Sequence, residues 1–167
     1  DQKISHVILQ AGVGGMAAAM VAGIAKYFNH IPQIIIVEPE SAACVLESIK
    51  TEKIEKISIE KESIMGGMSC GEVSLVPWEI LKNSLHYCVT VSDDYISKTI
   101  KYLANKEFSE EKIIGGECST PGIASLIGLS NDHETRKKIS LNENSNVLLF
   151  GCEGDADEEL YQKLLAG

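Results

Sequence analysis

The stretch His6-Val-Ile-Leu-Gln-Ala-Gly-Val-Gly-Gly-Met-Ala-Ala-Ala-Met20 decides the fold class of this chain. Residues His6–Gln10 are mostly apolar and predict a short strand that is buried on both faces. Glycines follow at positions 12, 14 and 15, and the Ala- and Met-rich run Gly14–Phe28 predicts a helix. Glycine lets a backbone turn tightly, and the first helical N–H groups are free donors. The order of strand, glycine loop and helix therefore favours a phosphate site. A tight turn with glycines used only for packing is the simpler alternative.

Length and composition are typical of one globular domain over residues 1–167. The net charge of −9 argues against binding to nucleic acid or to an anionic membrane surface, and no apolar run reaches membrane length. No signal peptide is recognisable, and the missing initiator Met suggests a fragment. The five cysteines form no CxxC pair, which argues against a disulfide framework or structural zinc. We therefore expect a cytoplasmic protein with no metal site.

Short apolar runs alternate with helical patterns along the rest of the chain. Further strands are predicted at Gln33–Val37, Lys56–Ile59, Tyr87–Val91 and Asn146–Gly151. Further helices are predicted at Ser41–Lys50, Ser92–Asn105, Ser119–Gly128 and Asp157–Leu165, with Ser41 and Ser92 as N-caps. This alternation predicts an α/β fold with three layers and a mostly parallel sheet. The Gly- and Met-rich connection 61–79 is longer than packing needs and is expected to line a site.

Glu38 offers one reading of the glycine loop. It follows a predicted strand and lies 24 residues after Gly14, which resembles the acid that binds ribose in dinucleotide-binding folds. An NAD(P)-type dinucleotide-binding domain is therefore one alternative that spacing alone leaves open.

Two later motifs carry candidate site residues. Glu117 and Ser119 follow a Gly-Gly pair and could lie beside the glycine loop, although Ser119 or Thr120 could equally be a plain helix cap. Cys152 follows the last predicted strand, where ligands of open α/β sheets bind. Its simpler interpretation is a small buried residue, the common fate of a free cysteine.

These motifs, in this order, resemble the C-terminal part of fold type II pyridoxal-phosphate-dependent enzymes, and most closely the 2,3-diaminopropionate ammonia-lyases. The resemblance extends over essentially all 167 residues. It rests on the segments Leu9–Met16, Ile36–Pro39, Ile64–Glu72, Trp78–Leu81, Gly116–Glu117 and Glu153–Asp155. The glycine loop is shared widely in that fold type, whereas Ile64–Glu72 and Trp78–Leu81 point to the narrower group.

The resemblance implies a cofactor, a set of binding residues and a reaction. The cofactor is pyridoxal 5′-phosphate, with its phosphate held by Gly12, Val13, Gly14, Gly15 and Met16. Cys152 would face the pyridine nitrogen, and Glu117 would lie near the face of the ring. The implied reaction is β-elimination of ammonia from 2,3-diaminopropionate, which gives pyruvate and a second ammonia, in a protein that is a homodimer at full length.

No lysine in this chain has the sequence context of the family's Schiff-base lysine, which is expected upstream. We therefore assign no catalytic residue to residues 1–167 and predict that the chain alone is inactive. Besides the dinucleotide-binding domain, a non-catalytic α/β ligand-binding module remains an alternative.

Overall fold

Four parallel strands form the central sheet of residues 3–166, the part of the chain that the computed structural model describes. They are β1 (His6–Gln10), β2 (Gln33–Pro39), β3 (Tyr87–Val91) and β4 (Val147–Leu149). Their order across the sheet is β3-β2-β1-β4, so the last strand of the chain pairs with the first. β1 lies inside the sheet, and all five of its residues are buried.

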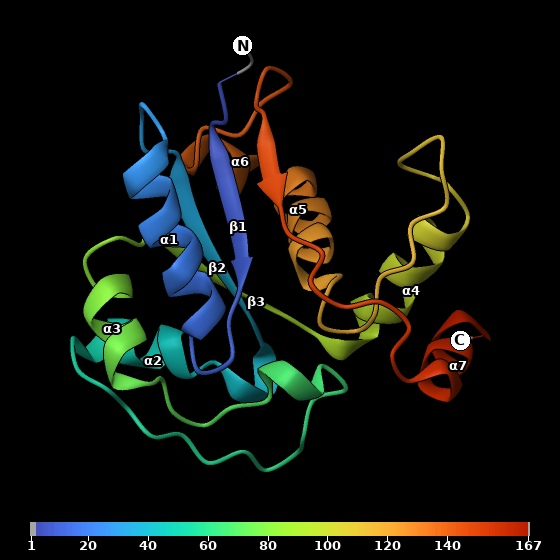
Figure 1. The fold of residues 1–167 in the computed structure, drawn as a ribbon, viewed down its shortest axis with the longest axis horizontal. Helices are drawn as coiled ribbons and strands as arrows, with labels where there is room; N and C mark the ends of the chain where they lie inside the picture. The colour runs from blue at the N-terminus through green and yellow to red at the C-terminus, as the bar shows by residue number, and fades with distance from the viewer. Residues whose placement is uncertain (1–2, 167) are drawn as a thin grey trace.

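Helices cover both faces of this sheet (Figure 1). α1 (Gly15–Tyr27), α2 (Cys44–Thr51) and α3 (Leu75–Leu81) pack on one face, and α4 (Asp93–Ala104) and α5 (Pro121–Asn131) pack on the other. The short helix α6 (His133–Lys138) follows α5, and α7 (Glu158–Ala166) lies against α4. The predicted three-layer α/β fold is therefore confirmed.

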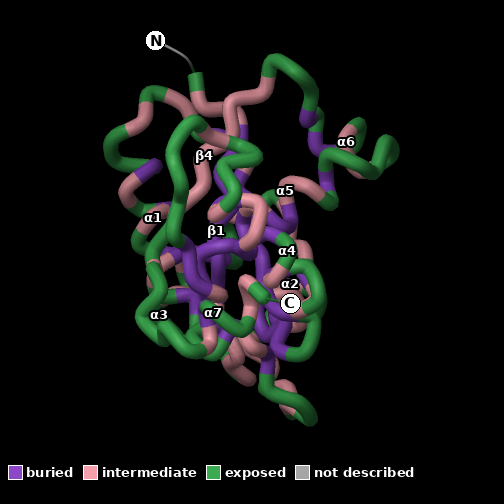
Figure 2. Tube along the Cα trace, turned by 90° about the vertical axis from the view of Figure 1, so that its right-hand side faces the viewer, coloured by how far each residue is buried: buried purple, intermediate pink, exposed green. Residues whose placement is uncertain are grey.

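The alternation of strand side chains produces two cores. Val7 and Leu9 point to the layer of α1–α3, whereas Ile8 points to the layer of α4 and α5. In Figure 2 the buried stretches, in purple, gather mostly in the middle of the molecule, and the exposed stretches, in green, lie on the outer loops. Over residues 3–166, no helix is both long and apolar enough to cross a membrane.

Some predicted elements are wrong. Lys56–Ile59 is not a strand, because among residues 3–166 it pairs with the rest of the chain only through the isolated bridge between Lys56 and Glu72. Ser41 lies in the 3₁₀ turn Glu40–Ala42 and does not cap α2. Ser92 does cap α4, by accepting a hydrogen bond from the Asp94 N–H.

The predicted connection 61–79 contains the 3₁₀ turn Gly66–Met68 and the first part of α3, a helix that the sequence pattern does not reveal. The helix α6 is not predicted either. The predicted final strand, Asn146–Gly151, is shorter in the structure, and its end at Leu149 leaves the following residues free of the sheet ladder.

Candidate functional site

A cavity of about 320 Å³ opens at the carboxyl end of β1, beside the segment that leaves β4. Such a position, beyond the carboxyl ends of parallel strands, is where open α/β sheets bind ligands. Its lining comes from four parts of the chain: Gln10–Met16, Gly67–Met68, Cys118 and Cys152–Glu153.

The glycine loop, residues Gly12–Gly15, lines this cavity, and at two of its positions only glycine fits without strain. Gly14 has φ 90° and ψ 0°, a left-handed conformation that side chains disfavour. A Cβ at Gly12 would lie 2.8 Å from the Gly67 carbonyl oxygen, so the turn Gly66–Met68 can approach only a glycine. Gly15 differs, because a Cβ there would meet no atom within 4 Å.

The backbone amides of this loop are available to a ligand. Within residues 3–166, the N–H groups of Gly12 through Ala17 donate to no protein acceptor, and α1 has no side-chain cap. Free N–H groups at the start of a 13-residue helix, together with its dipole, are the groups that can hold a phosphate-like anion.

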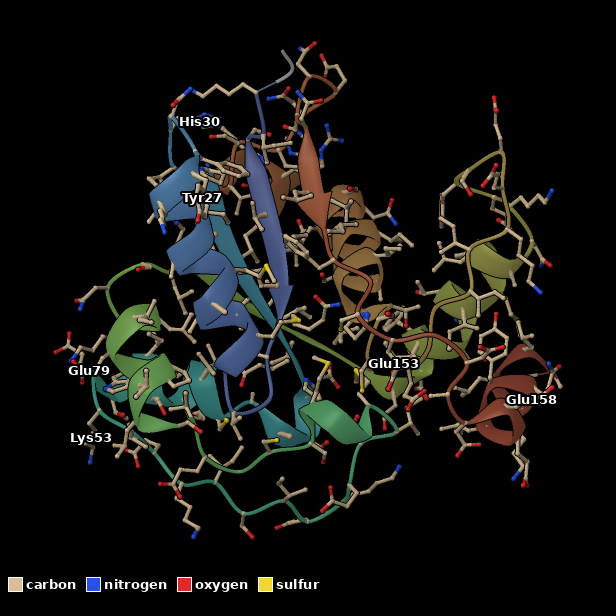
Figure 3. All side chains as sticks on the ribbon, in the orientation of Figure 1. Tyr27, His30, Lys53, Glu79, Glu153 and Glu158 are labelled. Carbon is tan, nitrogen blue, oxygen red and sulfur yellow. The ribbon has the colours of Figure 1, made fainter. Side chains whose placement is uncertain are left out.

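The opposite wall joins two distant segments. Ser119 Oγ accepts from the Glu153 N–H at 2.8 Å and donates to the Glu153 carbonyl oxygen at 2.6 Å. The Cys118 N–H donates to Glu153 Oε2 at 2.8 Å, and Glu153 lies on the segment between β4 and α7 (Figure 3). Gly116 permits this approach, because a Cβ there would overlap the Gly154 carbonyl oxygen.

Gln10 connects this wall to β1. Its side chain is buried, with 4% exposed, and its Nε2 donates to the carbonyl oxygens of Phe150 at 2.6 Å, Ser119 at 3.2 Å and Cys118 at 3.3 Å. No sequence motif marks Gln10 as a site residue. The one available signal was a polar residue at the end of an otherwise apolar strand.

Cys152 is exposed, and its thiol lies 3.9 Å from the Cys118 carbonyl oxygen. Partial burial, with a smaller contribution from the Glu153 carboxylate, raises the pKa of Cys152 above its ordinary value. The thiol is therefore neutral at neutral pH and offers a weak, uncharged contact to a ligand.

Glu117 lies beside this cavity without lining it, next to Cys118. Partial burial raises the pKa of its carboxyl, and the carboxylates of Glu153 and Asp157 raise it further. The structure thus brings Gly12–Met16 and Cys152 into one cavity, and leaves Glu117 at its margin.

Glu38 cannot act as a ribose-binding acid in this structure. It is fully buried, and its two carboxylate oxygens accept from the N–H groups of Val45 at 2.8 Å and Leu46 at 2.9 Å. Its carboxylate therefore caps α2, and the dinucleotide-binding alternative is not favoured.

Comparison with known proteins agrees with this geometry. Residues 1–153 match the family described as pyridoxal-phosphate dependent enzyme. The diaminopropionate ammonia-lyase of Escherichia coli (strain K12) is 32% identical over 96% of this chain, and that of Salmonella typhimurium (strain LT2) is 27% identical over the same share. The chain spans 42% of the length of these curated relatives.

Solved structures give the same result. The Escherichia coli enzyme in complex with D-serine superposes with a TM-score of 0.86 at 30% identity, over 98% of this chain and 41% of that one. Threonine deaminase isoform 2 of Solanum lycopersicum, at 20% identity, shares the fold with a TM-score of 0.80, over 99% of this chain and 45% of that one.

The parallel α/β sheet, the glycine loop at its carboxyl edge and these structural matches together place the chain in the class of fold type II cofactor-binding proteins. This chain belongs to the family of pyridoxal-phosphate-dependent enzymes, in that fold type.

Proposed function

We propose that this chain is the C-terminal, cofactor-phosphate-binding domain, residues 1–167, of a lyase that acts on 2,3-diaminopropionate. The overall reaction is elimination of the β-amino group as ammonia, followed by hydrolysis to pyruvate and a second ammonia. One observation supports the cofactor role above all: the free amides of the glycine loop and the thiol of Cys152 line the same cavity. The identity to the Escherichia coli enzyme supports the choice of substrate.

The residues fit pyridoxal 5′-phosphate at both ends. The N–H groups of Gly12–Met16 would hold its phosphate, since Gly12 and Gly14 leave no room for side chains there. Cys152 would face the pyridine nitrogen, and Glu117 would lie near the ring. When bound, the cofactor supplies the electron sink for bond breaking at the substrate's Cα.

Cys152 would determine how strongly the pyridine ring of the cofactor withdraws electrons from the substrate. A neutral thiol does not hold a proton on the ring nitrogen as a carboxylate would, and its raised pKa keeps it neutral. A weaker sink suits elimination, because negative charge at Cα can expel the β-substituent instead of accumulating on the ring.

The Schiff-base lysine is expected upstream of residue 1, in a part of the protein with the remaining acid and base residues. We further propose that the whole protein works as a cytoplasmic homodimer on a small amino-acid substrate. The chain of residues 1–167 alone should then have no lyase activity.

Two measurements test this proposal. Crystals of the chain soaked in sulfate should show an anion at the amides of Gly12–Gly15; an ordered, open loop without one would contradict the phosphate site. The purified chain, mixed with pyridoxal phosphate and 2,3-diaminopropionate, should release pyruvate no faster than the free cofactor. Faster release would mean that a lysine of this chain, such as Lys26 or Lys50, holds the cofactor, and borohydride reduction with peptide mapping would identify it.

A further inference from the structure

Gln10 joins three of the four segments that line the cavity. It is the last residue of β1, directly before Ala11 and the glycine loop. Its Nε2 faces carbonyl oxygens from the turn before α5 and from the segment after β4. Three acceptors around one end fix the orientation of the amide, because only the nitrogen can donate to them.

The segment after β4 depends on such a contact. The ladder between β1 and β4 ends at the pair Ile8 and Leu149, so Phe150 and Cys152 lie beyond it. In the described part of the chain, this segment is fixed at Phe150 by the Gln10 side chain. It is fixed at Glu153 by Ser119 and by the N–H groups of Gly116 and Cys118. Cys152 lies between these two attachments.

The glycine loop is held by other groups. The Ala11 N–H donates to the Val37 carbonyl oxygen at 3.0 Å, and the Ser74 N–H donates to the Val13 carbonyl oxygen at 3.0 Å. Neither contact involves the Gln10 side chain. Loss of the Gln10 donors should therefore leave the phosphate end of the cavity intact and release the end that carries Cys152.

We infer that Gln10 is a positioning residue, which holds the Cys152 segment at the distance from the glycine loop that one bound cofactor requires. This inference rests on the proposed function. It accounts for a buried glutamine at the end of an apolar strand, although Gln10 Oε1 has no hydrogen-bond partner among the described residues. A buried orphan acceptor is costly, and the two N–H groups of the amide, shared among three carbonyl oxygens, compensate for it.

The test uses two probes. Inorganic phosphate reports on the glycine loop alone. 4′-Deoxypyridoxine 5′-phosphate adds the pyridine ring but lacks the aldehyde, so it cannot bond covalently to any lysine. Its ultraviolet absorption reports the environment and protonation of the ring nitrogen. Both affinities are measured on the unaltered chain, on Gln10→Met, and on Gln33→Met as a control at the other end of the sheet.

Gln33 is a matched control because its Oε1 is also buried without a described partner, while it lines no part of this cavity. In Gln10→Met, we expect phosphate affinity within about twofold of the unaltered chain, and ring-analogue affinity lower by about tenfold, the effect of roughly one lost hydrogen bond. The absorption of the bound analogue should also shift. Gln33→Met should change neither affinity nor absorption.

If Gln10→Met does not fold, Gln10→Glu replaces it in the affinity measurements. A protonated carboxyl still donates one hydrogen bond and an ionised one donates none. Analogue affinity relative to Gln33→Met should therefore fall as the pH rises.

The outcomes separate the two proposals. An unaltered chain that binds neither probe overturns the proposed function, and this inference with it. Normal binding by the unaltered chain, with the ring analogue bound equally well by Gln10→Met and Gln33→Met, overturns the inference alone. Equal loss of phosphate and analogue in Gln10→Met also overturns it, because that result would show a general structural role.

Discussion

Gly14 and Gly15 are neighbours in sequence, but only Gly15 has a backbone conformation and surroundings that tolerate a side chain. Gly14 has a positive φ, and a Cβ there would lie 3.1 Å from both Leu81 Cδ1 and Pro77 Cβ. We expect Gly14→Ala to lower the free energy of unfolding by about 1–3 kcal/mol and to weaken phosphate binding. Gly15→Ala should raise it by up to about 1 kcal/mol, because the alanine meets open space in a helix.

Urea denaturation followed by the fluorescence of Trp78, the chain's single tryptophan, measures both variants. Trp78 is buried in the core beneath the glycine loop and so reports on this region. Equal stability of the two variants would contradict the assignment of the left-handed conformation to Gly14.

A second prediction for a single residue concerns the charge of the side chain at Cys152. In the complete enzyme, Cys152→Asp should place a carboxylate against the ring nitrogen and keep that nitrogen protonated. The absorption of the bound cofactor should change, and elimination should slow by about tenfold or more, in line with the loss of a tuned contact. Cys152→Ser, which remains neutral, is the control. An unchanged spectrum and rate in the aspartate variant would place Cys152 outside the cofactor site.

At the scale of elements, α2 depends on a carboxyl group from β2. Burial raises the pKa of Glu38 from 4.5 to about 7, and the N–H groups of Val45 and Leu46 offset this only in part. Because the pKa of Glu38 is higher in the folded state than in the unfolded state, Glu38 contributes to the free energy of unfolding. This contribution is fully present below pH 4.5 and is lost as the pH rises through 7. The free energy of unfolding should therefore fall by up to about 3 kcal/mol between pH 4.5 and pH 8.

Glu38→Gln should flatten this dependence, because the amide does not titrate. Glu79→Gln, on the exposed surface of α3, should leave the slope unchanged. Denaturation at a series of pH values measures the three slopes. A Glu38→Gln slope equal to that of the unaltered chain would mean that Glu38 is not the group responsible.

Local pattern predicted some elements well. β1 and β3 have the predicted bounds, because short continuous apolar runs fit strands buried between helices. α3 was missed because its first residues belong to the segment 61–79, which was interpreted as a connection. Its Pro77 lies in the first helical turn, where a proline removes no helical hydrogen bond. Ser41 failed as a cap because Glu38, fixed by the neighbouring strand, supplies the acceptor instead.

The candidate site likewise contains some residues that the sequence predicted and others that it did not. Gly12–Met16 are contiguous, and their chemistry follows from strand, loop and helix order. Cys152 was singled out by its place after the last predicted strand, and the resemblance alone supplied its role at the pyridine nitrogen. The pairing of the last strand with the first, which brings Cys152 beside the glycine loop, was not predicted. Gln10, Cys118 and Glu153 line the cavity through contacts between distant segments, and no local pattern carries that information.

The whole molecule has two strand edges that no described strand covers. β3 and β4 are the outer strands of the sheet, and their residues are mostly half-buried. Unpaired edges and partly exposed apolar side chains promote pairing between chains. We expect sedimentation velocity to show association of the isolated chain that increases with concentration. A single monomeric species over a wide concentration range would contradict this expectation.

The pairing of the last strand with the first also has a consequence for biosynthesis. Ser5 and Asn146, whose groups bond beside the start of the ladder, are 141 positions apart in the sequence. On the ribosome, β1 and the glycine loop must therefore emerge long before the segment that completes their cavity. Contacts of such long range form slowly, and a nascent chain exposes one side of β1 throughout this interval. Capture of the cofactor thus cannot precede the synthesis of β4 and the segment after it, and chaperones have the whole of that interval in which to act on the open strand.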